Sequence, residues 1–192
     1  MFLHPARHFA DAAPAPTLPD AATGVAGGIL IAGTMVETAS GWRDVVTLRA
    51  GDRVQTFDGG LCPLTAADPV ALPPEPGRMA VRIAGGTFGA CADLALLPGA
   101  QVLIRTAARL PEAARALVPA LALRGLPGVT LVPLPGAVAA MRLAFADEEV
   151  IWANTGVLLH CPAPQPGVQF RALPPAEARR ALAPAALFRR AG

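Results

Sequence analysis

The sequence contains no lysine and no tyrosine, and it has one serine, one asparagine and three histidines. All 16 basic residues are therefore arginine, they are scattered along the 192 residues, and the net charge is only +2. Nucleic-acid binding calls for a basic stripe with aromatic residues between the charges, and aromatic residues make up only 5% of the chain. We therefore expect no nucleic-acid partner.

The cysteines and histidines are too few and too far apart to suggest a metal site. No two of the cysteines lie within a few residues of each other, so they fit no common metal-ligand spacing. They are Cys62, Cys91 and Cys161. His4 and His8 have a helical spacing but no third ligand nearby. We expect no metal and no cofactor. We expect the cysteines to be buried free thiols, and one disulfide plus a spare thiol is the alternative.

Long hydrophobic runs are also missing. The apolar stretch "VAGGILIAGTMV" is too short to cross a bilayer. It follows a segment with Pro14, Pro16 and Pro19 and has no cationic cluster directly before it, so we expect no signal peptide and no membrane span. The cytoplasm is the default expectation for the compartment, and export without an N-terminal signal stays open.

The residues that are abundant divide the chain into three parts. Residues 1–27 are rich in Ala, Pro and Gly without a lasting period, and we interpret them as a flexible leader. Residues 28–162 hold many short β-prone runs separated by glycine turns, which predicts an all-β domain. Residues 163–192 read as a proline-rich linker followed by a short amphipathic helix over 174–190, begun by Pro175.

Within the β domain, most strands are predicted from β-prone runs bounded by turns. These runs are "GILIAGTMVET", "GWRDVVTL", "RVQTF", "RMAVRI", "DLALL", "AQVLIR", "GVTLVPL", "VAAMRLAF" and "EEVIWA". Five prolines predict a mobile loop over residues 63–78. Helix formers predict about two helical turns within 111–123, limited by Pro119.

Several polar and aromatic residues admit a functional and a structural interpretation. Asp52 and Asp58 are spaced like a carboxylate pair, but Asp beside a Gly turn more often bonds its own backbone. The acidic run 147–149 predicts a solvated turn rather than a metal site. Trp42 and Trp152 are interpreted as core or half-buried packing residues.

The arginines near the C-terminus are the place where we would first look for a protein partner. They are Arg179, Arg180, Arg189 and Arg190, and a solvated helix face is the simpler interpretation. A partner otherwise stays unknown.

Four sequence blocks in order resemble a known family. The pattern "GT-V-T" at residues 33–38 leads into "GWRDVVTLRAGDRVQTFDGG", and "VRIAGGTFG" (81–89), "DLALLPGAQVLI" (93–104) and "DEEVIWANTG" (147–156) follow. Together they resemble a bacterial, single-domain Hint (Hedgehog/intein) domain. The resemblance implies a pseudo-symmetric β horseshoe whose two chain ends lie close together. It also implies autoprocessing, in which a Cys or Ser at the first residue attacks the preceding carbonyl.

The positions that would carry this chemistry hold other residues. Ile29 aligns with the nucleophile, and an alkyl side chain has no lone pair with which to attack a carbonyl. Leu97 and Ala100 align with the family's Ser and His, and Glu148 aligns with its late His. The sequence has no His-Asn pair for C-terminal cleavage.

We therefore expect a degenerate Hint-type domain that no longer autoprocesses and acts as a binding or structural module. The alternative is a self-cleaving domain with Cys62 or Cys161 as an unconventional nucleophile and His160 as its base. Cys161 directly follows His160, and neighbours on a strand point to opposite faces, which weakens that pair. A decaying fragment without a retained role is the third hypothesis.

Overall fold

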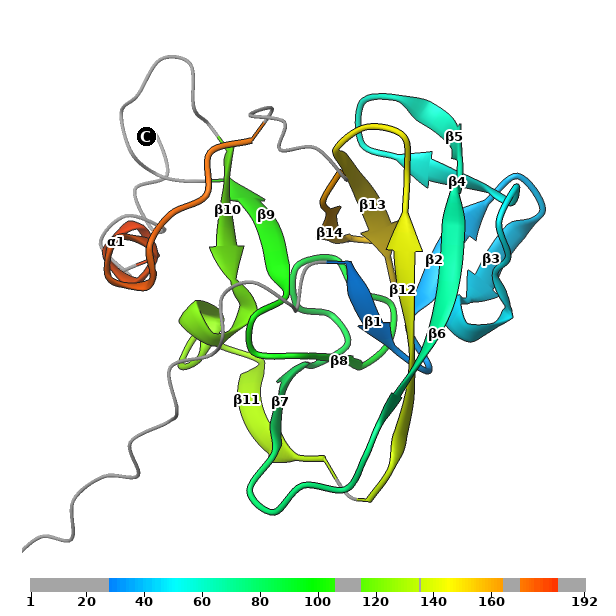
Figure 1. Cartoon of the computed structure of the whole chain (residues 1–192). Coiled ribbons are helices and arrows are strands. Elements are labelled where there is room, and N and C mark those ends of the chain that lie inside the picture. Colours follow the sequence, from blue (N-terminus) through cyan, green and yellow to red (C-terminus); the bar gives the residue numbers. More distant parts are fainter. Residues whose placement is uncertain (1–27, 106–114, 135, 164–169, 183–192) are drawn as a thin grey trace, which may run out of the picture.

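Antiparallel β-strands are the main secondary structure of the computed structural model (Figure 1). The model describes residues 28–105, 115–134, 136–163 and 170–182. The expectations for the leader 1–27 and for residues 183–192 lie outside the described residues. The first strands are β1 (Ile29–Ile31), β2 (Met35–Thr38), β3 (Gly41–Asp44), β4 (Arg53–Thr56), β5 (Gly60–Pro63), β6 (Ala66–Leu72) and β7 (Met79–Ile83). The remaining strands are β8 (Leu94–Leu96), β9 (Gln101–Arg105), β10 (Arg115–Pro119), β11 (Val129–Pro133), β12 (Val138–Ala144), β13 (Glu149–Ala153) and β14 (Val157–Cys161).

The strands form three sheets. The largest has the order β10-β9-β14-β13-β2-β4-β5, with β3 added to β2. A three-stranded sheet β1-β12-β6 lies against one side of it, and β11-β7-β8 forms the third sheet (Figure 1). Their facing sides bury one large apolar cluster that includes Val36, Val54, Ile83 and Leu159. The prediction of an all-β domain is confirmed.

Short helical pieces connect or flank the sheets. The 3₁₀ turn η1 (Val45–Thr47) follows β3, and Asp44 accepts a hydrogen bond from the Val46 N–H at its start. A second 3₁₀ turn, η2 (Ala120–Leu123), follows β10. The helix α1 (Pro175–Ala181) begins with a proline in its first turn and packs against β10 and η2, so the predicted short helix is confirmed over these residues.

Two predictions about elements are wrong. Residues 66–72 are not a loop, because β6 pairs with β12 along its whole length, with Pro69 opposite Met141. Since β6 is the edge strand of its sheet, the N–H that Pro69 lacks costs the ladder little. Residues 115–119 are a strand rather than a helix, because β10 pairs with β9 in full register.

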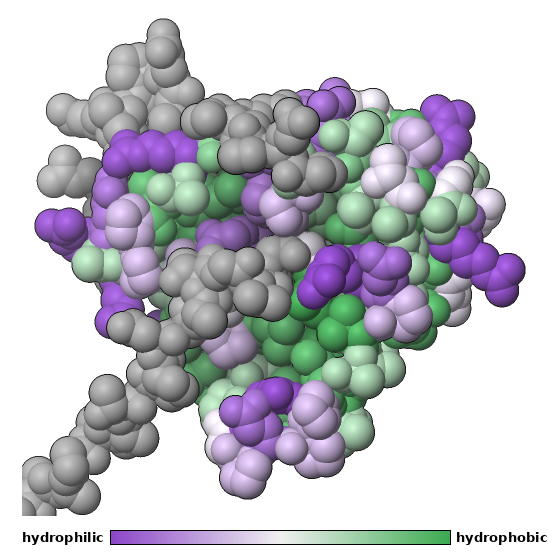
Figure 2. Space-filling model, viewed as in Figure 1, coloured by the Kyte–Doolittle hydropathy of each residue, from purple (hydrophilic) through white to green (hydrophobic). Residues whose placement is uncertain are grey.

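The hairpin predicted around Asp58-Gly59 is confirmed, because β4 and β5 pair from Arg53↔Pro63 to Thr56↔Gly60. The strands predicted over "VAAMRLAF" and "EEVIWA" are also present, but they do not pair with each other. The first joins β1 and β6, and the second joins β14, β2 and β4. On the face shown in Figure 2, hydrophilic side chains are scattered, with apolar areas between them.

Candidate functional site

The first strand holds Ile29, the residue that we align with the family's nucleophile. Ile29 starts β1, pairs with Arg142 of β12, and is 5% exposed. The carbonyl before it belongs to Gly28, and its oxygen accepts a hydrogen bond of 3.0 Å from the Leu143 N–H. The carbonyl that a nucleophile would attack is therefore part of a β ladder, and the residue after it offers only a hydrocarbon.

Gly28 also marks where the two ends of the β domain meet. A Cβ built on Gly28 would lie 3.3 Å from Cδ of Pro162 and 3.0 Å from the Leu143 oxygen. Gly28 has a φ of 75°, which favours glycine, so the close approach and the backbone conformation require the same residue type. The resemblance implied this proximity of the chain ends.

The middle block lies in the turn between β8 and β9. The Ala100 N–H donates to the Leu97 oxygen at 3.0 Å, and the Ala100 oxygen accepts from the Ala120 N–H at 2.8 Å. Ala100 is 5% exposed. Ala100, which we align with the family's histidine, is a buried methyl group that transfers no proton.

Glu148 is not part of a solvated turn, so that expectation is wrong. Its side chain is 8% exposed and pairs with His160, with 2.7 Å between Oε1 and Nε2. Nδ1 of the same imidazole is buried without a hydrogen-bond partner among the described residues. The two residues are twelve apart in the sequence, and only the β13–β14 pairing brings them together.

His160 and Cys161 lie on opposite faces of β14. Val150 is the cross-strand neighbour of His160, and Glu149 is that of Cys161. Cys161 belongs to the large core, where burial raises the pKa of its thiol to about 12, with a smaller contribution from the Glu149 charge. Since the thiolate is the nucleophile, this cysteine is in its unreactive form at neutral pH.

Cys62 lies on β5 of the β4–β5 hairpin. Its Sγ is 3.6 Å from Thr56 Oγ1 and donates to the Gly59 oxygen at 3.5 Å. Burial and the nearby Glu149 raise the pKa of this thiol, and the Thr56 hydroxyl opposes the shift. Among the described residues, no hydrogen bond joins either thiol to His160.

Other residues singled out by the sequence have structural surroundings. Asp52 accepts a hydrogen bond from the Arg49 N–H at 2.9 Å and forms an ion pair with Arg43 at 3.0 Å. Its contacts therefore stabilise the turn in which it lies. Cys91 is exposed, so burial was a wrong expectation for this cysteine. Trp42, on β3, is 38% exposed, so it is a partly covered surface residue and not a core residue.

Asn154, the only asparagine, is a buried connector that sequence reasoning missed. Its Oδ1 accepts the Met35 N–H at 2.9 Å, and its Nδ2 donates to the Asp93 oxygen at 3.1 Å. Its own N–H donates to the Met35 oxygen at 2.8 Å, and its φ is 44°. A lone Asn in a tight "ANTG" turn was the available signal, since Asn tolerates positive φ.

Within the part of the chain that the structure describes, no three His, Cys, Asp or Glu side chains are grouped closely enough to hold a metal ion. The helices of that part are too short or too polar to cross a bilayer.

The structure is thus an all-β architecture in which Gly28, before the first strand, lies beside Pro162, after the last one. The sequence model of the Hint domain family matches residues 29–158, more than half of the chain. The chain therefore belongs to the Hint domain family.

Solved structures of similar proteins are distant. The bacterial intein-like domain from Clostridium thermocellum is 13% identical with a TM-score of 0.48, covering 69% of this chain and 97% of its own. The MchDnaB-1 intein is 17% identical with a TM-score of 0.40, covering 68% of this chain and 98% of its own. No curated protein matches the chain.

Proposed function

We propose that this Hint domain protein performs no autoprocessing and acts as a binding or structural module. The observation that carries the proposal is the junction of Gly28 and Ile29. The residue that should attack the Gly28 carbonyl is Ile29, a buried alkyl side chain without a lone pair.

The rest of the acyl-shift apparatus supports the same proposal. An N-to-S or N-to-O shift needs a nucleophile, a group that transfers protons and a donor that stabilises the oxyanion. Ala100 supplies only a methyl group in the middle block. Glu148 stands at the late position, but as a carboxylate paired with His160 rather than as an imidazole directed at the junction.

The two thiols also support it. The unconventional alternative needs a thiolate with a nearby base, and the pKa of each thiol is raised, by burial first. His160 hydrogen-bonds to Glu148 instead. No observation favours the self-cleaving alternative, so it remains only as an outcome of the test.

The test is the intact mass of the full chain during a day with a strong thiol or with hydroxylamine, either of which cleaves an ester or thioester. We expect one species of unchanged mass. Two fragments that divide at Gly28 and Ile29 would contradict the proposal.

Matched variants make the test specific. Cys62→Ala and Cys161→Ala should also remain uncleaved, and cleavage of the parent that disappears in either variant would establish the alternative. The double variant Ile29→Cys with Ala100→His introduces a thiol nucleophile and an imidazole at the aligned positions. It is tested for cleavage under the same conditions. Folding of each variant is checked by circular dichroism.

A further inference from the structure

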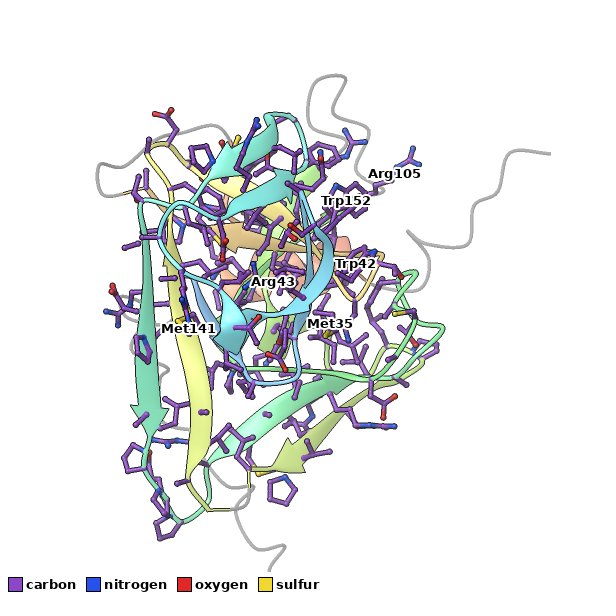
Figure 3. All side chains as sticks on the ribbon, turned by 90° about the vertical axis from the view of Figure 1, so that its right-hand side faces the viewer. Met35, Trp42, Arg43, Arg105, Met141 and Trp152 are labelled. Atoms are coloured by element: carbon purple, nitrogen blue, oxygen red, sulfur yellow. The ribbon has the colours of Figure 1, made fainter. Side chains whose placement is uncertain are left out.

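A cavity of about 430 Å³ is lined by residues of β9, β10, β13 and β14 and of the segments around them, apart from the positions that we align with autoprocessing. Trp152 of β13 and Arg105 of β9 both line it, and Figure 3 shows these two side chains on the opposite side of the molecule from Met141 of β12. Neither Ile29 nor Ala100 lines it. Its volume is within the range of pockets that hold one small organic molecule.

The walls of the cavity are apolar and partly aromatic. Phe57 and Trp152 lie with their ring centroids 6.0 Å apart at a tilt of 49°, and Phe88 is 40% exposed although it is a large hydrophobic residue. Leu126 and Leu182 add aliphatic surface. Exposed aromatic surface around a hollow is a feature of ligand sites rather than of ordinary protein surface.

Two arginines give the cavity its charge. Arg105 and Arg115 are direct cross-strand partners in the β9–β10 ladder, and both are exposed. Like charges directly opposite each other destabilise a strand pair. Among the described residues, neither arginine forms an ion pair with a carboxylate, and no acidic side chain lines the cavity.

Arg115 places its positive charge directly beside the apolar wall of the cavity. Its Cζ lies 4.7 Å from the centroid of the Phe57 ring, a cation–π arrangement that holds the guanidinium against the aromatic side. A ligand that places an acid group between the two arginines would therefore have the aromatic and aliphatic walls beside its apolar part. Arginine is the side chain best suited to bind a carboxylate through two parallel hydrogen bonds.

From these observations we infer that the cavity binds a small amphipathic carboxylic acid, with the carboxylate at Arg105 and Arg115 and the hydrocarbon part against Phe57 and Trp152. Charge complementarity selects this occupant. The residues that follow Leu182 in the sequence include Arg189 and Arg190 and no acidic side chain, so their charge has the wrong sign for this site. The inference goes beyond the proposed function and does not depend on it.

Trp152 makes the test direct. The chain has two tryptophans and no tyrosine, so Trp42→Phe leaves Trp152, which lines the cavity, as the only tryptophan reporter. The full-length Trp42→Phe protein is titrated with dodecanoate below its micelle-forming concentration while Trp152 emission is recorded. We expect a saturable change in emission, and we expect dodecanol, which has the same chain without the charge, to bind at least tenfold more weakly.

Charge variants in the same background locate the site. Arg105→Gln should weaken dodecanoate binding by roughly tenfold, because a charge-assisted hydrogen bond is lost. Arg124→Gln, an exposed arginine outside the lining, should bind like the parent. A titration without a saturable change, equal binding of dodecanol and dodecanoate, or equal weakening by Arg105→Gln and Arg124→Gln would each overturn the inference. Intact mass under thiol, by contrast, decides the proposed function separately.

Discussion

Asn154 joins the β13–β14 turn to β2 and to the segment before β8 through both ends of its amide. Replacing it with Ala removes two buried hydrogen bonds and leaves the Met35 N–H without its acceptor, and it places a residue less tolerant of a φ of 44° in the turn. We expect Asn154→Ala to lower the free energy of unfolding by about 3 kcal/mol, measured by urea denaturation. Thr130→Ala, on the exposed side of β11, should change it by less than about 0.5 kcal/mol.

The three thiols differ in exposure, so they should react in a fixed order. Cys91 is exposed, Cys62 is partly buried with a raised pKa, and the pKa of the buried Cys161 is raised to about 12. At pH 8, iodoacetamide should modify Cys91 first, Cys62 more slowly, and Cys161 only after unfolding. Peptide mass mapping over time checks the order, and early labelling of Cys161 would show that its environment is different.

The raised pKa of the Cys161 thiol predicts how the free energy of unfolding depends on pH. In the unfolded chain the Cys161 thiol titrates near its ordinary value of 9.0, whereas the folded state keeps the proton to about 12. Its contribution to the free energy of unfolding is therefore fully present below about pH 9 and is lost as the pH rises toward 12. Urea denaturation from pH 8 to 11 should show this loss in the parent, and a smaller loss in Cys161→Ala.

Part of the candidate site could be predicted from residue types. The rest depends on contacts between residues that are far apart in the sequence. The absence of a nucleophile at Ile29 and of a histidine at Ala100 is visible in the sequence alone. The pairing of Glu148 with His160 is not, because it depends on the register of β13 with β14. The acidic run looked solvated because charge alone says nothing about which of its members turns inward.

At the scale of elements, local propensity succeeded where strands lie between clear turns and failed where long-range pairing decides. Glycine turns predicted the β4–β5 hairpin. The alanine-rich run at 111–123 has helical propensity, but five cross-strand pairs with β9 make residues 115–119 a strand. Proline at position 69 suggested a loop, although an edge strand accepts it.

The β13–β14 turn and the loop after β7 touch through their backbones, which gives a prediction for one glycine. A Cβ on Gly156 would lie 2.5 Å from the Phe88 oxygen and 2.5 Å from the carbonyl carbon of Gly89, and backbone atoms cannot easily move away. We expect Gly156→Ala to lower the free energy of unfolding by about 3 kcal/mol, measured by thermal or urea denaturation.

Gly41→Ala separates this overlap from simple backbone strain. Gly41 has a φ of 94°, but a Cβ there would meet no atom within 4 Å. We expect a cost of about 1 kcal/mol from the positive φ alone. Equal costs for the two variants would mean that the two loops do not approach as closely as described.

The molecule as a whole combines the scaffold of the Hint domain family with a junction that we propose to be unreactive. Four weak blocks in order were enough to indicate the family because each marks a strand or a turn that the fold requires. The cavity beside Arg105 and Arg115 could not be predicted, because its lining comes from segments between residues 57 and 182 that only the folded chain brings together.

The central claim is that this Hint domain keeps its fold without cutting its own backbone. Mass spectrometry of the freshly purified full chain, before any added nucleophile, tests it most directly. The account predicts a single species with the mass of the whole chain. A species that begins at Ile29, accompanied by the released segment that ends at Gly28, would contradict it.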